Sequence, residues 1–262
     1  MLKVIRQDDG DIWLPASGDS ADLYWWRREE FAYTSDVLGR LAPGLRAPTL
    51  RHRAERPEGT VALWLEHVPE VDRWTLDLLG AFATRLGRAQ AAAAADPPDD
   101  PWLARGFLRK YLRLHEVTDP DGILERLERL PHTLAHNDLH PANLLGEDGA
   151  VVIDWAYCGL APLGLDPGVL VADGVADSVI RPEDADAAGA AVWNGYSTGL
   201  REAGFDGDLE VIRWAFLSST ALRLSWLDPE LAREHSTRES WRAASAMLQR
   251  WREAARGLPS RP

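Results

Sequence analysis

The chain has 262 residues, a length that suits one large domain or two lobes with buried cores. Its 29 basic and 41 acidic residues give a formal net charge of −12, which opposes binding to nucleic-acid phosphates and attracts cationic small molecules. A single cysteine, Cys158, excludes an internal disulfide, and no apolar run approaches the ~18 residues of a membrane helix, so we expect a cytoplasmic protein without membrane or nucleic-acid partners.

The first seventy residues alternate between strand and helix patterns. Residues 2–6, "LKVIR", alternate as a strand does. Apolar residues recur at helical spacing across residues 23–41, with Asp22 placed as the N-cap. Two apolar or alternating runs, at residues 49–53 and 60–68, flank the turn-rich segment "AERPEG" and predict a β-hairpin. The predicted order is therefore strand, helix, strand, strand.

From residue 75 onward the pattern is mostly helical. Residues 75–95 repeat apolar positions with a 3.6-residue period until "DPPDDP" stops the helix. Five later segments also favour helix, namely residues 101–117, 121–130, 187–204, 209–227 and 240–257. Between them we expect one pair of strands, within residues 144–153. We accordingly divide the chain into a partial first lobe at residues 1–68 and a helical second lobe at residues 69–262.

The segment "TLAHNDLHPANLLGEDGAVVIDWAYCG" holds a dense group of polar side chains. Two short strands about the turn "GEDG" predict an antiparallel hairpin, whose outer ends lie together. Asn143 just before the hairpin and Asp154 just after it should therefore be neighbours. An amide oxygen beside a carboxylate suits Mg²⁺, which takes its other ligands from waters and phosphates. Asp138, five residues before Asn143, can reach the same cleft and is placed to act on a substrate.

His136, Asp138, Asn143 and Asp154 match the spacing H-x-D-x-x-x-x-N followed by a strand-terminal aspartate, which kinase-type phosphoryl-transfer enzymes use. In a loose, metaphosphate-like transition state little covalent work remains for the protein. The site must hold metal, phosphate and acceptor hydroxyl in line and offset negative charge. Asp138 can serve despite being a weak base, because orientation of the hydroxyl matters more than basicity.

The wording "HNDLHPANLL" with "VVIDWA" resembles the aminoglycoside phosphotransferase and choline kinase-like family, relatives of the protein kinases. The resemblance extends to "LWLEHV", "LGRAQA" and "GLAPLGLDPGVLV", and covers roughly residues 2–173. It implies an α+β, bilobal protein-kinase-like fold with the catalytic loop and the acceptor pocket in the helical lobe. The implied reaction is Mg²⁺-dependent transfer of the γ-phosphoryl group of ATP, or of GTP, to a hydroxyl of a small molecule.

The resemblance also implies roles for individual residues. Asp138 is then the catalytic aspartate, supported by His136, while Asn143 and Asp154 hold Mg²⁺. Backbone groups near Leu65 and His67 would hold adenine, and Asp166 would brace the catalytic loop.

"LKVIR" and the later "WRREEF" look like the family's ATP-phosphate lysine and its helix glutamate. We assign these roles to Lys3 and Glu29. Glu30 is the competing glutamate, because it falls on the apolar face of the predicted helix.

The chain departs from the family pattern at its start, because kinase-type lobes place a phosphate-covering hairpin before the lysine strand. Only Met1 and Leu2 precede Lys3, and no glycine-rich loop elsewhere in the first seventy residues replaces that hairpin. We therefore expect an N-terminally truncated small lobe, from a misassigned start or a shortened protein. Residues 2–6 would then be an edge strand, with self-association or disorder as the expected result.

Two other interpretations remain open. His136, Asp138 and His140 also spell H-x-D-x-H, a pattern compatible with a metallohydrolase, although the other histidines are scattered. Alternatively the protein is a catalytically weakened nucleotide-binding module. For an active enzyme, the acidic composition favours a cationic, aminoglycoside-like acceptor, with carboxylates such as Asp173 and Asp177 as candidate contacts.

Overall fold

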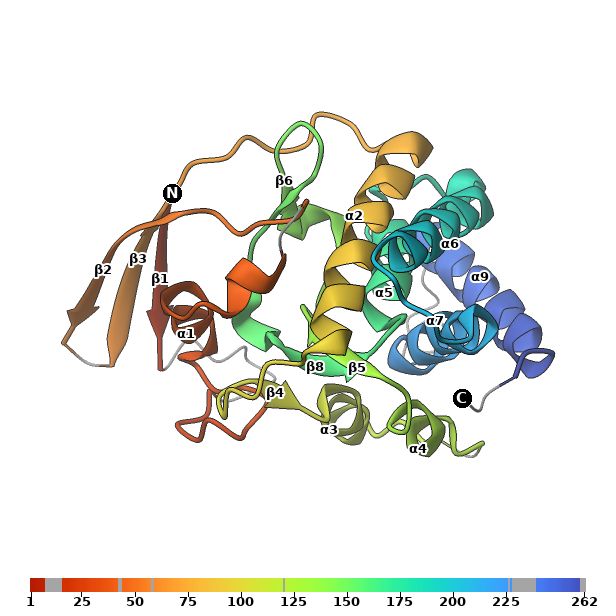
Figure 1. Cartoon of the computed structure of the whole chain (residues 1–262), viewed down its shortest axis with the longest axis horizontal. Helices are drawn as coiled ribbons and strands as arrows, with labels where there is room; N and C mark the ends of the chain where they lie inside the picture. The colour runs from red at the N-terminus through yellow and green to blue at the C-terminus, as the bar shows by residue number, and fades with distance from the viewer. Residues whose placement is uncertain are drawn as a thin grey trace.

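The computed structural model describes residues 1–7, 16–41, 44–57, 59–119, 121–225, 227 and 239–259. Figure 1 shows a small β-sheet at one end of the molecule and a group of packed helices at the other, with the β6 hairpin between them. No helix in these described ranges combines the length and apolar character needed to span a bilayer.

The N-terminal sheet has the strand order β1-β3-β2 and is antiparallel throughout. Its strands are β1 (Leu2–Arg6), β2 (Leu50–Arg56) and β3 (Thr60–Leu65). Alternate side chains of the central strand β3 are buried in an apolar cluster, as period-two patterning requires. The predicted strand and hairpin are confirmed, and β1 lies at an edge of the sheet. Self-association through that edge stays a prediction.

The helix predicted at residues 23–41 is much shorter than expected. The structure forms α1 only over Arg28–Thr34 and a 3₁₀ helix, η1, over Val37–Leu41. The break lies at Ser35, which is extended (ψ 178°). Asp22 caps a turn instead of this helix, since its carboxylate accepts the Tyr24 N–H at 3.0 Å.

Arg28 explains why the chain bends before α1. Its side chain is fully buried, and its nitrogens donate to five backbone carbonyl oxygens, those of Ser20, Asp22, Leu23, Trp102 and Ala156, at 2.5–3.4 Å. Burial lowers the pKa of Arg28 to about 10. The guanidinium therefore ties α1 to the turns just before it and to two segments that are distant in the sequence, at Trp102 and Ala156.

We expect Arg28→Met to lower the free energy of unfolding by about 3–5 kcal/mol, because several backbone carbonyl groups lose a charged hydrogen-bond donor. Urea denaturation followed by circular dichroism measures the change. The adjacent Arg27 is partly exposed, so Arg27→Gln should cost about 1 kcal/mol or less. Equal costs for the two variants would contradict this role of Arg28.

The second half of the molecule is built around two helices that pack closely. α2 (Leu76–Ala95) begins at Thr75, whose hydroxyl accepts the Leu78 N–H, and α6 (Ala185–Glu202) lies against it. A Cβ at Gly195 would lie 2.1 Å from the Gly80 carbonyl oxygen, so only glycine permits this approach. This close approach of the two backbones sets the position of α2, and therefore the position of Gln90 on it.

The other α-helices in the described part of the chain are α3 (Phe107–Leu114), α4 (Ile123–Leu127), α5 (Leu165–Ala176), α7 (Leu209–Arg223) and α9 (Glu239–Arg256). The first two are shorter than the predicted 101–117 and 121–130. Each begins after a left-handed glycine, at φ 65° for Gly106 and 61° for Gly122. α5, almost entirely buried, was not predicted as a helix. Residue 226 of the predicted helix 209–227 lies outside the described residues, and residue 257 of the predicted 240–257 lies one position beyond the end of α9.

The prediction of a single strand pair after residue 75 is wrong. A second sheet joins β4 (Ala104–Arg105), β8 (Gly159–Pro162) and β5 (His132–Ala135) in the order β4-β8-β5. These strands are two to four residues long and pair across long sequence separations. So short a run carries no detectable periodicity of its own. β5 ends at Ala135, so the sheet anchors the chain immediately before the motif that begins at His136.

Candidate active site

The hairpin that carries the two predicted metal ligands forms as expected. β6 (Leu144–Leu145) pairs antiparallel with β7 (Val151–Val152). The ladder continues outward, because the Ile153 N–H donates to the Asn143 carbonyl oxygen at 2.9 Å. Asn143 therefore lies across from Ile153, one residue before Asp154, at the open end of the hairpin.

Asp154 is presented by a left-handed backbone conformation, φ 63° and ψ 61°. Its Oδ1 lies 2.9 Å from Lys3 Nζ, and the same ammonium lies 2.5 Å from Glu29 Oε2. Burial would lower the pKa of Lys3, but the charges of Glu29 and Asp154 raise it above its ordinary value. Burial also raises the pKa of Glu29 to about 7 against the opposing charge of Lys3. Lys3 thus connects β1, α1 and the end of the hairpin.

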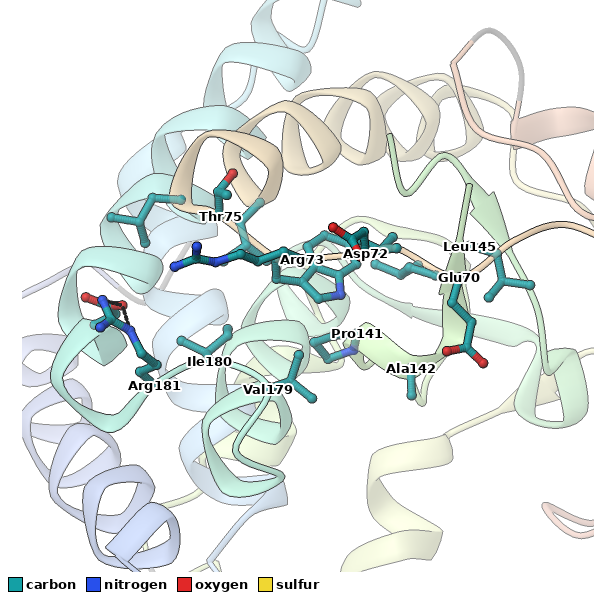
Figure 2. Close-up of a pocket in the computed structure, with 16 residues that line it drawn as sticks. Glu70, Asp72, Arg73, Thr75, Pro141, Ala142, Leu145, Val179, Ile180 and Arg181 are labelled. Atoms are coloured by element: carbon teal, nitrogen blue, oxygen red, sulfur yellow. Dashed lines mark hydrogen bonds and ion pairs between the residues drawn. The ribbon is translucent and has the colours of Figure 1, made fainter. Parts of the chain in front are cut away.

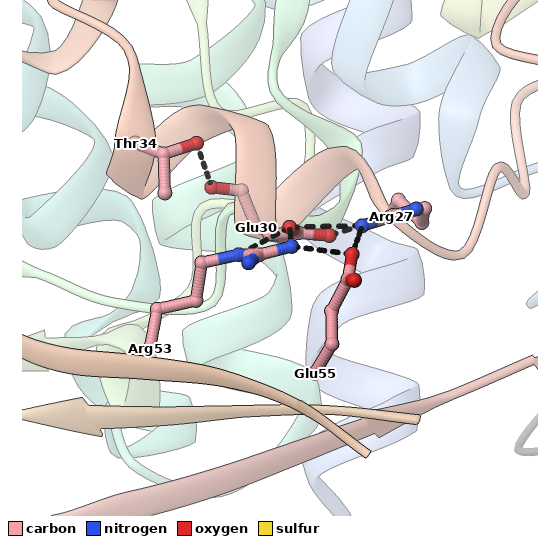
Figure 3. A network of polar contacts seen from close by, with 5 residues as sticks. All are labelled: Arg27, Glu30, Thr34, Arg53 and Glu55. Carbon is pink, nitrogen blue, oxygen red and sulfur yellow. Dashed lines mark hydrogen bonds and ion pairs between the residues drawn. The ribbon is translucent and has the colours of Figure 1, made fainter. Parts of the chain in front are cut away.

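Glu30, the competing glutamate, belongs to a different network (Figure 3). Its carboxylate accepts hydrogen bonds from Arg27 Nε at 2.7 Å and from Arg53 Nε at 2.6 Å. Arg27 and Arg53 also bind Glu55 on β2. Adjacent positions on α1 therefore point to separate partners, Glu30 toward Arg27 and Arg53 and Glu29 toward Lys3.

The loop at residues 136–143, predicted to be catalytic and called the catalytic loop below, is supported by the Asp166 side chain. This buried carboxylate accepts the backbone N–H groups of His136 and Asn137, each at 2.9 Å. Gln90 Nε2 donates to it at 2.9 Å, and Tyr196 O–H donates to Gln90 Oε1 at 2.7 Å. Burial raises the pKa of Asp166, while the loop N–H groups oppose that shift. Sequence reasoning missed Gln90 and Tyr196 as supports, although Gln90 lies within the "LGRAQA" motif.

His136 uses both ring nitrogens inside the protein. Nδ1 accepts the Asp138 N–H at 3.3 Å, and Nε2 contacts the Ile153 carbonyl oxygen at 2.8 Å. The ring also packs on Trp155, with 4.8 Å between centroids. His136 therefore links the catalytic loop to the end of β7 and has no ring nitrogen left for a metal.

The donor set at the hairpin fits a hard cation such as Mg²⁺. Asn143 Nδ2 donates to the Asp138 carbonyl oxygen at 3.0 Å, which leaves the amide oxygen as its available ligand atom. Asp154 has a side chain 47% exposed, so one amide and one carboxylate oxygen remain for an ion that also binds phosphate oxygens. Within the described ranges, no three His, Cys, Asp or Glu side chains form a metal-binding group.

Asp138 is paired with a cation that sequence reasoning did not anticipate. Arg223 Nη2, at the end of α7, donates to Asp138 Oδ1 at 2.6 Å and lies 3.7 Å from Asp173 Oδ2 on α5. The Arg223 side chain is 6% exposed and the Asp138 side chain 33% exposed. No sequence motif marks this contact, because Arg223 lies 85 residues after its partner.

The two backbone positions predicted to hold adenine, Leu65 and His67, differ in their contacts and exposure. Leu65 donates its N–H to the Met1 carbonyl oxygen at 2.8 Å, and its own carbonyl accepts from the Met1 ammonium at 2.7 Å. A nucleotide base at Leu65 would have to displace these contacts. His67 is exposed on the linker that follows β3.

Two cavities flank the loop and hairpin. The larger, of ≈ 620 Å³, lies between the linker after β3, the catalytic loop and the segment after α5. Figure 2 shows Glu70 and Asp72 from the linker on one side and Val179 to Arg181 on another, with Pro141 and Ala142 between them. The smaller, of ≈ 240 Å³, is lined by Lys3, Glu29 and Asp154 together with aromatic side chains from residues 24–26.

Asp173 should make stability depend on pH. Burial raises its pKa to about 6 from 3.8, against the lowering effect of Arg223 and with Asp138 and Asp177 adding to the rise. The folded state then holds a proton that the unfolded state has lost between about pH 4 and 6, so this group makes stability fall as pH rises through that window. Asp173→Asn should remove that loss, worth about 3 kcal/mol at most. Urea unfolding from pH 4 to 7 measures it.

The exposed Asp206 provides the matched control, because Asp206→Asn should leave the pH dependence of unfolding unchanged. If Asp173→Asn and wild type lose stability in parallel from pH 4 to 6, the buried carboxyl group is not the cause.

Comparison with known proteins identifies the family. The sequence profile of the phosphotransferase enzyme family matches residues 22–205. An amicoumacin kinase in complex with AMP-PNP, Ca²⁺ and Ami is similar in structure, with a TM-score of 0.56 and 19% identity over 87% of this chain and 80% of that one. A choline/ethanolamine kinase family protein from Mesorhizobium loti is also similar in structure, with a TM-score of 0.52 and 16% identity over 88% of this chain and 80% of that one. No curated protein matches the sequence.

At such low sequence identity, the two similar structures support a conclusion about the fold alone. Their structural similarity confirms the predicted α+β, kinase-like architecture. The profile match covers well over half of the chain, including the catalytic loop and the β6–β7 hairpin. The chain therefore belongs to the phosphotransferase enzyme family.

Proposed function

We propose that the protein transfers the γ-phosphoryl group of ATP to a hydroxyl group of a small molecule. One observation carries this proposal: Asp138, Asn143 and Asp154 are joined through a single loop and hairpin by the Asn143–Asp138 and Ile153–Asn143 hydrogen bonds. Lys3, on β1 of the N-terminal sheet, donates a hydrogen bond to Asp154. This arrangement supplies a metal position, a phosphate cation and an acceptor-orienting carboxylate.

Each residue has a distinct task in this scheme. Asn143 and Asp154 would hold Mg²⁺, which when bound offsets charge on the phosphate oxygens. Lys3, anchored by Glu29, presents its ammonium to the nucleotide phosphates. Asp138 accepts a hydrogen bond from the acceptor O–H, and takes its proton as the new O–P bond forms and the bond between the γ-phosphorus and ADP breaks.

The comparisons support this assignment at the level of class. The similar amicoumacin kinase was captured with AMP-PNP and Ca²⁺, a nucleotide analogue and a divalent ion. The acidic composition, with a net charge of −12, favours a cationic acceptor such as an aminoglycoside. GTP is a second candidate donor.

The metallohydrolase interpretation has less support. His136 has no ring nitrogen free for a metal, and Asp138 faces the positive charge of Arg223. A cation beside Asp138 disfavours a second cation at that carboxylate.

The function is tested by incubating the purified chain with ATP or GTP, Mg²⁺ and a panel of aminoglycosides, amino alcohols and neutral polyols. We expect nucleoside diphosphate release that requires an acceptor, together with an acceptor product carrying one added phosphoryl group by mass spectrometry. Calorimetry with AMP-PNP and Mg²⁺ measures nucleotide binding separately. Binding without phosphorylation of any acceptor would instead favour the weakened nucleotide-binding module.

A further inference from the structure

Arg223 is a buried cation that its surroundings do not satisfy. Within the described part of the chain, its Nε and Nη1 are buried without a hydrogen-bond partner, and Nη2 alone donates, to Asp138 Oδ1. Arg28 provides the contrast, because its guanidinium is equally buried but bonds five backbone carbonyls. An unsatisfied buried donor costs about 1–3 kcal/mol. Arg223 is therefore poorly explained as a structural tie, and its one strong contact is with the proposed catalytic carboxylate.

The orientation of the Arg223 guanidinium is strongly restricted. It lies over the rings of Tyr111 and Phe107 on α3, at 4.8 and 5.4 Å from the centroids. Asp173 on α5 faces the same Nη2 at 3.7 Å. Side chains from two other helices, α3 and α5, thus hold the guanidinium, and the charges of Asp173 and Asp138 raise the pKa of Arg223 despite its burial.

The contact with Arg223 makes the two carboxylate oxygens of Asp138 different. Oδ1 accepts from Arg223, whereas Oδ2 carries no hydrogen bond within the described part of the chain. A hydrogen bond to one oxygen restricts rotation of the carboxylate about its Cβ–Cγ bond, so the second oxygen can meet an acceptor hydroxyl in a narrower range of geometries. Misplacement of a reacting group by about 1 Å can cost roughly 100-fold in rate.

We propose that Arg223 is a positioning residue for phosphoryl transfer: by binding Asp138 Oδ1 it aims Oδ2 at the acceptor hydroxyl, while Tyr111, Phe107 and Asp173 hold the guanidinium in place. This inference rests on the proposed function, and it assigns the end of α7 to the acceptor side of the site. Arg223 itself does not touch the transferred group.

A double-mutant cycle between Arg223 and Asp138 tests the proposal in the full chain. With the best acceptor of the panel, Arg223→Met should lower kcat by about 10- to 100-fold, with little change in acceptor KM or in AMP-PNP affinity. Arg223→Lys should recover part of the loss. In the Asp138→Asn background, Arg223→Met should cost almost nothing more, because the residue acts only through that carboxylate.

Arg213 is the matched control, since it is an exposed arginine on the same helix that also lies over an aromatic ring, that of Trp193 at 6.0 Å. Arg213→Met should leave kcat unchanged. Full activity of Arg223→Met, or a loss that is the same in both backgrounds, would overturn the positioning role. If Arg223→Met unfolds, the Arg223→Lys cycle decides the same question. Absence of acceptor-dependent turnover in wild type would instead refute the proposed function itself.

Discussion

Replacing Asp138 by asparagine is expected to lower kcat for phosphoryl transfer by about 10²–10⁴-fold, the range associated with loss of a general base. The amide keeps the size of the carboxylate but cannot take the acceptor proton as the O–P bond forms. It also removes the charge that binds Arg223 Nη2 at 2.6 Å. Steady-state assay of diphosphate release, with and without acceptor, measures the loss.

Nucleotide binding should survive this change, because Asp138 lies on the acceptor side of the site in our scheme. AMP-PNP affinity measured by calorimetry with Mg²⁺ should therefore match that of wild type. Asp206→Asn, at an exposed position, serves as the control and should retain full activity. Turnover unaffected by Asp138→Asn would remove the catalytic assignment.

Replacing Asp154 by asparagine is expected to weaken the Mg²⁺-dependent part of AMP-PNP binding and to lower kcat by at least about 10²-fold, since phosphate charge is then poorly offset. The variant should fold normally, because asparagine readily adopts the left-handed conformation found at φ 63°. Lys3 loses one of its two carboxylate partners but keeps Glu29. Titration of nucleotide affinity against Mg²⁺ concentration distinguishes metal loss from general damage.

Asp148 offers a control within the same hairpin. It lies in the turn, where its side chain is 55% exposed and pairs with Arg85. Asp148→Asn should leave the Mg²⁺ dependence unchanged, although both variants remove one negative charge. Equal effects of the two substitutions would mean that the charge of the hairpin, and not a metal ligand at Asp154, supports nucleotide binding.

Local signals in the sequence predicted the elements that bring the two proposed metal ligands together. The turn "GEDG" between short apolar runs is enough to specify the β6–β7 hairpin, because hairpin register depends on adjacent residues. The β2–β3 hairpin was found for the same reason, and β1 was found from the alternation of its own residues. The spacing of His136, Asp138 and Asn143 on one loop likewise needs no tertiary information.

Helix boundaries were less accurate where side-chain contacts override periodicity. The pattern across residues 23–41 is apolar at helical spacing, yet Arg28 holds the preceding segment in turns by binding the backbone carbonyls of Ser20, Asp22 and Leu23. Likewise, β4, β5 and β8 are too short to show alternation and exist only because they pair with one another.

The sequence by itself determined the family, the α+β class and the loop-and-hairpin unit, because each depends on residues close together along the chain. Only the tertiary structure decided that Glu29 and not Glu30 meets Lys3, and that Arg223 binds Asp138. Neighbouring helix positions point about 100° apart, so which glutamate faces the lysine depends on how α1 is docked. Contacts between residues 85 positions apart depend on the packing of whole helices, which no local pattern encodes.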